Sequence, residues 1–136
     1  MNAIPRIVLA LMALVNFGRG SIHVFAADGG AHSIAGLDLG GERQTILSLF
    51  ATLGFGQIVK GLFEGYVVWR RPDLVALFLA LQTVDTLLAM ANLYLWRPLP
   101  VVVPGQPFNL ALLAIQMVAL GLALMTASAQ PRAAST

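Results

Sequence analysis

Hydrophobic residues form four long runs in this chain of 136 residues, and short polar segments separate them. Each run is close to the roughly 20 residues that a helix needs to cross the hydrocarbon of a bilayer. A backbone surrounded by lipid must satisfy its own hydrogen bonds, so such runs predict helices. We expect a single all-α domain over residues 1–136, an integral membrane bundle of four transmembrane helices. The spans are expected at about residues 4–25, 44–69, 73–96 and 108–127, with a disordered tail over 128–136.

Glycine and proline mark the segments between the spans. The loop after the first span, Ala27 to Gly40, is rich in Gly and Asp. Its apolar residues are expected to lie on the membrane surface as a short interfacial helix (Ile34, Leu37 and Leu39), although a lid over a pocket is an alternative. The segment Arg97 to Pro107 holds four prolines and is expected to be a stiff, extended connector.

Composition agrees with a membrane protein and excludes several kinds of site. Apolar residues make up 58% of the chain and charged residues 10%, against about 25% charged in soluble domains, and the mean hydropathy is +0.82. The chain has no cysteine and two scattered histidines, so we predict no metal site. No basic cluster exceeds Arg70-Arg71, so nucleic acid is not an expected partner. No cofactor is predicted.

Basic residues predict the orientation. With both termini in the cytoplasm (N-in, C-in), Arg6, Arg70, Arg71 and Arg132 lie inside, and only Arg43 and Arg97 lie outside. The first run resembles a signal peptide, but Arg19 and His23 follow its apolar core. We therefore expect it to be retained as a membrane helix.

Polar residues recur inside all four spans at helical spacing. Such repetition predicts a bundle with a polar interior and an apolar shell. The candidate network comprises Asn16, Arg19 and His23 in the first span, Gln57, Lys60 and Glu64 in the second, Gln82, Asp85 and Asn92 in the third, and Asn109 and Gln116 in the fourth.

Four of these residues carry charge, and their charges cancel: Arg19, Lys60, Glu64 and Asp85. A charged side chain at bilayer depth costs roughly 2.5–3.5 kcal/mol on insertion scales, so each needs a partner or a purpose. By depth, Asp85 lies between Lys60 and Arg19 and is expected to neutralise one of them. The network fixes helix order, lines a pocket or proton path, or receives its counter-charge from a partner subunit, and the sequence leaves these three readings open.

Glycines give the second span a narrow side. Gly61 and Gly65 have the small-xxx-small spacing that lets membrane helices approach closely, and Gly54 lies two turns before Gly61. We expect these three glycines to pack against a neighbouring helix, within the bundle or in a second copy.

The layout resembles small four-helix bacterial inner-membrane proteins, the DoxX-like group and related families. The shared features are the Gly/Asp loop after the first span, Ala27 to Leu39, and the Gly-rich second span, Leu53 to Gly65. The resemblance implies a multi-pass protein of the bacterial inner membrane with an accessory role. It transfers no catalytic residue.

Two functions remain open. The first is a non-enzymatic membrane protein, either an accessory or assembly subunit of a larger complex or a binder of lipid or quinone. The second is a small proton-coupled transport or membrane-enzyme unit that uses Lys60, Glu64 and Asp85. A cavity that reaches Lys60 and Asp85 would favour the second function, and dry side-chain contacts would exclude it.

Overall fold

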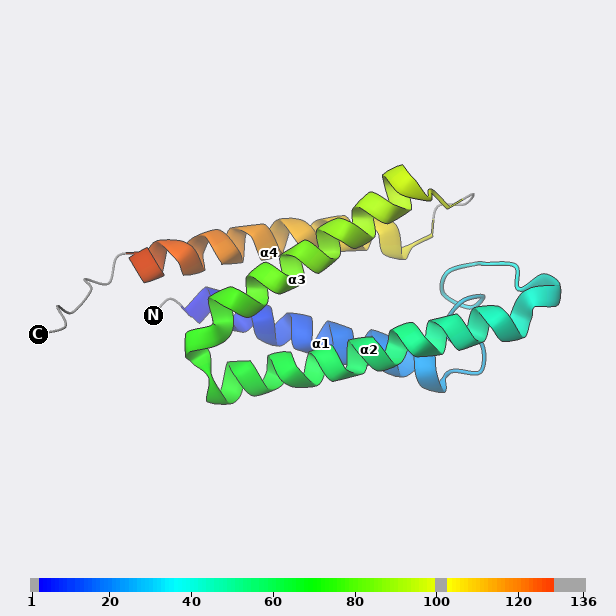
Figure 1. Cartoon of the computed structure of the whole chain (residues 1–136), viewed down its shortest axis with the longest axis horizontal. Coiled ribbons are helices and arrows are strands. Elements are labelled where there is room, and N and C mark those ends of the chain that lie inside the picture. Colours follow the sequence, from blue (N-terminus) through cyan, green and yellow to red (C-terminus); the bar gives the residue numbers. More distant parts are fainter. Residues whose placement is uncertain (1–2, 100–102, 129–136) are drawn as a thin grey trace, which may run out of the picture.

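The computed structural model describes residues 3–99 and 103–128 and contains four long helices that alternate in direction (Figure 1). They are α1 (Ala3–Phe25), α2 (Arg43–Arg70), α3 (Val75–Ala91) and α4 (Gly105–Ser128). The 3-10 turns η1 (Gly40–Glu42) and η2 (Pro72–Leu74) precede α2 and α3, and the π-helical turn η3 (Asn92–Trp96) extends α3. Each long helix with its extensions is long and apolar enough to cross a membrane. The predicted all-α, four-span fold is confirmed.

Two predicted boundaries at α4 are wrong. The helix begins at Gly105, so residues 105–107 form its first turn instead of ending an extended connector. Pro107 is compatible with this turn because the first backbone N–H groups of a helix have no partner to lose. At the other end α4 includes Ser128, the first residue of the predicted tail. The rest of the tail, 129–136, lies outside the described residues, as do residues 100–102.

The loop between α1 and α2 folds as a series of turns over residues 26–39, so the predicted interfacial helix is wrong. Asp28 organises the turns, because its carboxylate accepts backbone N–H bonds from Gly30 at 3.0 Å and Ser33 at 2.6 Å. These hydrogen bonds lower the pKa of Asp28 to about 2. Gly29 and Gly30 adopt φ angles of +59° and +74°, a region that glycine enters without strain.

Glycine sets how closely α1 and α2 approach. A Cβ added to Gly54 would lie 2.8 Å from the carbonyl oxygen of Gly20, and one added to Gly61 would lie 2.7 Å from that of Ala13. Gly65 does not pack against a helix of the same chain, since a Cβ there would meet no atom within 4 Å, and its packing against a second copy stays a prediction. Gly65 lies one turn beyond the close crossing, so only part of the predicted glycine face is used.

Helices α1 and α2 form one helical hairpin, and α3 and α4 form a second. An apolar core joins the two hairpins at one end of the bundle. It lies near the start of α1, the α2–α3 turn and the end of α4, and consists of Val8, Leu9, Val67, Val75, Leu79, Ala119 and Ala123. Beyond this core α2 packs extensively against α1 but barely against α3. In Figure 1 α3 diverges from the α1–α2 hairpin toward the opposite end.

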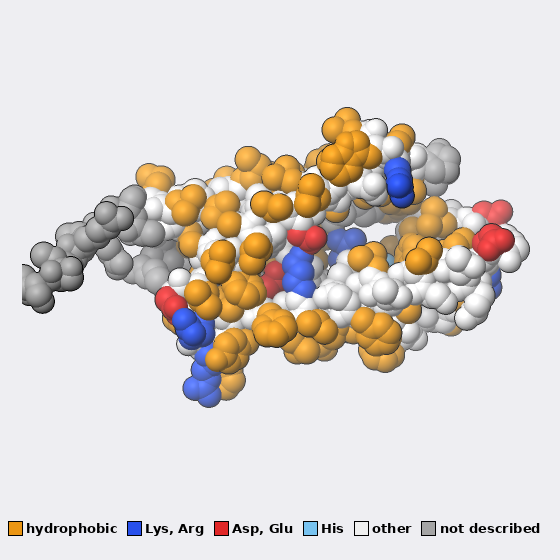
Figure 2. Space-filling model, viewed as in Figure 1, with side chains coloured by type: hydrophobic (Ala, Val, Ile, Leu, Met, Phe, Trp, Pro, Cys, Tyr) orange, Lys and Arg blue, Asp and Glu red, His pale blue; other side chains and the backbone are white. Residues whose placement is uncertain are grey.

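The outer surface of the helices is hydrophobic. Large apolar side chains such as Leu14, Leu49 and Met125 are about 70% exposed on the isolated chain, and Figure 2 shows hydrophobic side chains along both hairpins. This surface suits contact with lipid chains, so the four spans make this a multi-pass membrane protein.

Candidate functional site

A cavity of about 660 Å³ lies between the two hairpins, beyond the apolar core. All four helices contribute to its wall, and nine of the eleven predicted polar residues line it. Those nine are Asn16, Arg19, Gln57, Lys60, Gln82, Asp85, Asn92, Asn109 and Gln116. The two predicted residues outside its wall are His23 and Glu64.

An ion pair joins α2 to α3 at the side of this cavity. Lys60 pairs with Asp85, which is one of the two partners that the sequence allowed for Asp85. The side chains remain 29% and 66% exposed, so the pair lies at the opening and not in the core. Figure 2 shows basic and acidic side chains facing each other in the middle of this surface, between hydrophobic side chains of the two hairpins.

A buried hydrogen-bond network lies behind the ion pair. Asn16 of α1 donates through Nδ2 to Oε2 of Glu64 at 2.8 Å and to Oε1 of Gln82 at 3.1 Å. An amide group has two N–H bonds, so Asn16 can make both contacts at once. Gln82 donates in turn to Oγ1 of Thr86 at 3.2 Å. Glu64 is only 1% exposed, and its partner is the neutral Asn16 and not a base.

Arg19 also has a neutral partner. Its guanidinium, on α1, donates to Oδ1 of Asn109 on α4 at 2.7 Å. In the part of the chain that the structure describes, Arg19 forms no ion pair, although the sequence offered Asp85 as a partner. Asn92, which is exposed, lines the cavity near the same end of the bundle. Arg19 therefore keeps donors that the described side chains do not use.

Two glutamine carbonyls lack partners within the described residues. Gln116 is fully buried and donates through Nε2 to the sulfur of Met12 at 3.2 Å, while its Oε1 accepts no hydrogen bond. Oε1 of Gln57 is buried and unpaired in the same way. Both residues line the cavity, but neighbouring atoms cover these two oxygens, so the unused polar groups that the cavity wall presents are the donors of Arg19.

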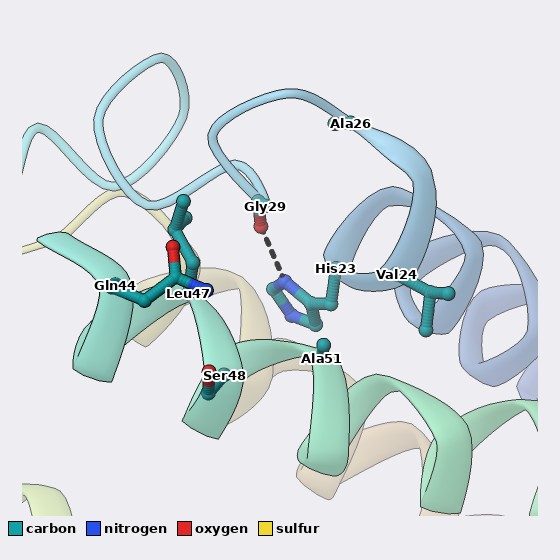
Figure 3. A pocket seen from close by; sticks show the side chains of 8 residues that line it. All are labelled: His23, Val24, Ala26, Gly29, Gln44, Leu47, Ser48 and Ala51. Atoms are coloured by element: carbon teal, nitrogen blue, oxygen red, sulfur yellow. Dashed lines mark hydrogen bonds between the residues drawn. The ribbon is translucent and has the colours of Figure 1, made fainter.

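His23 belongs to a separate, smaller pocket of about 260 Å³ under the α1–α2 loop (Figure 3). Its Nδ1 lies 2.7 Å from the carbonyl oxygen of Gly29, and because a carbonyl only accepts, Nδ1 carries the proton. The ring meets Phe50 edge-on at 5.1 Å. Gln44 and Ser48 complete the polar wall. The prediction that groups His23 with the polar network is therefore wrong, since the loop holds this side chain apart.

Sequence reasoning missed two parts of the site. Thr86 extends the buried network, and its spacing from Gln82, one helical turn, was the available signal. The π-helical turn over Asn92–Trp96 had no signal in the pattern of apolar residues. Such turns occur frequently at functional sites because they redirect side chains locally. Among the described residues, no group of three His, Cys, Asp or Glu side chains could hold a metal ion.

Comparison of the chain with models of known protein families, with curated proteins and with solved structures finds no match. The resemblance to DoxX-like proteins stays a prediction.

Proposed function

We propose that this protein binds a small molecule inside the membrane, in the cavity between its two hairpins. The observation that carries the proposal is a cavity that reaches both Lys60 and Asp85. Its volume of about 660 Å³ falls within the roughly 300–1,000 Å³ typical of ligand pockets. A network that served only to fix helix order would be closed by side-chain contacts, as the Asn16–Glu64 contact is.

The composition of the wall supports the same proposal. Ligand sites combine an apolar lining with a few convergent polar groups. Here Leu53, Met90 and Leu93 supply apolar surface, and Arg19 and Lys60 supply charge. A cavity that reaches Lys60 and Asp85 favours the substrate-handling form of the second hypothesis. The lipid- or quinone-binding form of the first also needs such a cavity, whereas a purely structural network does not.

We further propose the N-in, C-in orientation in a bacterial inner membrane. Arg6, Arg70 and Arg71 lie at the end of the bundle that holds the start of α1 and the end of α2, and Arg43 and Arg97 lie at the other. Basic residues concentrate on the cytoplasmic side. An assembly with a second copy or with a larger membrane complex is a further proposal, which the hydrophobic outer surface permits.

Proton coupling is the second candidate function, and Glu64 favours it. Its carboxyl group is buried, lacks a basic partner among the described residues, and connects through Asn16 to the cavity wall. Intramembrane carboxyl groups of this kind mark proton paths in transporters. If it operates here, ligand binding depends on pH in the native protein and loses that dependence in Glu64→Gln.

The binding proposal is tested by native mass spectrometry of gently extracted protein. Gly56 lines the cavity, and an added Cβ there meets no atom within 4 Å, so we expect the side chain of Gly56→Leu to occupy part of the cavity. Gly65→Leu is the matched control, on the same helix and equally free of contacts but outside the wall. We expect a retained small molecule on the native protein and the control, and its loss from Gly56→Leu. Identical spectra for all three proteins would contradict the proposal.

A further inference from the structure

We infer that the ligand of this cavity is an amphiphile with an anionic headgroup, and that Arg19 binds the anion. The inference rests on the proposed binding function and specifies its ligand class. It begins from the guanidinium of Arg19, which has five N–H donors and one hydrogen bond, to the neutral Asn109.

The charges of the cavity wall favour an anion. Three charged side chains line it, and two of them, Lys60 and Asp85, neutralise each other. Among the residues that the structure describes, Arg19 is left as an unmatched positive charge. Glu64 does not line the cavity, and its carboxylate accepts from Asn16 instead. An oxyanion matches the planar fork of a guanidinium with two parallel hydrogen bonds, which a single amide oxygen cannot do.

The depth of Arg19 suits a lipid headgroup. Arg19 lies six residues before the end of α1, which is about 9 Å along a helix, and Asn109 lies four residues after the start of α4, about 6 Å. Asn92, where α3 passes into its π-helical turn, lines the cavity at the same end. The anion subsite is therefore close to the level at which lipid headgroups meet the hydrocarbon.

The opening between α2 and α3 provides a path for an apolar chain. Leu53, Met90 and Leu93 line the cavity beside the opening, and the helices around it carry hydrophobic side chains on their outer surface (Figure 2). An amphiphile bound with its headgroup at Arg19 can extend its chain through this opening into the bilayer. A fully soluble anion would leave these apolar walls without a partner.

The test is a titration of the purified, detergent-solubilised protein, followed by native mass spectrometry. The probes are phosphatidylglycerol, a diacylglycerol with the same acyl chains but no phosphate, and free glycerol phosphate. One charge-assisted hydrogen-bond pair is worth about a tenfold preference or more. We expect the native protein to bind phosphatidylglycerol at least about tenfold more tightly than the diacylglycerol, which has no oxyanion for Arg19 to bind. Arg19→Gln should abolish this preference and Arg19→Lys should keep most of it. Arg70→Gln, which changes an exposed arginine outside the cavity, should leave it unchanged.

The outcomes separate this inference from the binding proposal. Equal binding of both lipids, blocked by Gly56→Leu, overturns the anionic headgroup and leaves the binding function standing. Lipid binding that Gly56→Leu does not affect overturns the binding function as well. Glycerol phosphate that binds as tightly as phosphatidylglycerol overturns the requirement for an acyl chain. A preference that survives in Arg19→Gln overturns the role of Arg19.

Discussion

The two faces of α2 are packed in opposite ways. Toward α1, Gly54 and Gly61 bring the backbones so close that a single added carbon would meet a carbonyl oxygen at less than 3 Å. Toward α3, the same helix leaves a cavity of about 660 Å³, which Lys60 and Asp85 span with an ion pair.

The difference shows that the polar residues of the spans have two roles. Asn16 and Glu64 lie where helices are close, and they form a buried contact that fixes the α1–α2 hairpin. Lys60 and Arg19 face the cavity between the hairpins, a space that can hold a ligand. The face of the helix on which a residue lies, and not its type, separates the structural part of the network from the candidate site, and Asn16 belongs to both because it also lines the cavity.

Substitution of Gly54 should have the largest effect. Gly54→Leu places a side chain against the Gly20 backbone, which cannot move away without separating α1 from α2. We expect a loss of about 3 kcal/mol or more in the free energy of unfolding, measured by denaturant titration in micelles. Gly56→Leu, two residues away but facing the cavity, should cost far less. Equal losses of stability in Gly54→Leu and Gly56→Leu would contradict the claim that α2 packs closely toward α1 and loosely toward α3.

Removal of Lys60 should have the next largest effect. Lys60→Met leaves Asp85 without its partner at bilayer depth, which costs about 2.5–3.5 kcal/mol. In the double variant Lys60→Met/Asp85→Leu neither charge remains, so most of the stability should return. A double-mutant cycle of unfolding free energies measures this coupling, and additive losses would show that the pair does not couple α2 to α3.

Replacement of Asn16 should have a moderate effect. Asn16→Leu leaves acceptors on Glu64 and Gln82 unpaired, and we expect a loss of about 1–3 kcal/mol. Asn92→Leu is the control, because Asn92 is exposed and should change the stability little. The same unfolding titration distinguishes the two, and a similar loss in both variants would place Asn16 outside the structural part of the network.

The smallest effect is local and depends on pH. Since hydrogen bonds lower the pKa of Asp28 from 3.8 to about 2, its contribution is fully present above about pH 4 and is lost as the pH falls through 2. We expect the Gly30 and Ser33 amides to lose their protection from hydrogen exchange as the pH falls through 2. Asp28→Asn should reduce the protection of these two amides already at pH 5. Asp38→Asn is the control and should leave their protection unchanged, because Asp38 accepts its hydrogen bond from Gly40. Protection unchanged down to pH 1.5 would contradict this assignment.

Much of the fold follows from the sequence because its determinants are local. The length of each apolar run decides the spans, and the second span, predicted over residues 44–69, is observed as Arg43–Arg70. The α4 start was missed because four prolines favour an extended segment, whereas Pro107 also fits a first helical turn.

The site was harder to predict from the sequence, because the rotation and separation of helices are not local properties. The spacing of Asn16, Gln57 and Gln116 predicts that each lies on a polar face, but not which faces meet. Asp85 had two possible partners, and in the folded chain it pairs with Lys60 while Arg19 contacts Asn109. Gly65 shows the same limit, because its spacing is right but α1 is not close there.

The central claim, that an accessible cavity separates the hairpins, is tested most directly by thiol labelling. The chain has no cysteine, so single cysteines report without background. Ala89 lines the cavity, Leu88 is exposed on the outer surface, and Ala13 is buried against Gly61. In membranes, a water-soluble thiol reagent should label Ala89→Cys and not Leu88→Cys or Ala13→Cys, and Gly56→Leu should slow the labelling of Ala89→Cys. Labelling of Ala89→Cys that is as slow as that of Ala13→Cys would contradict the account.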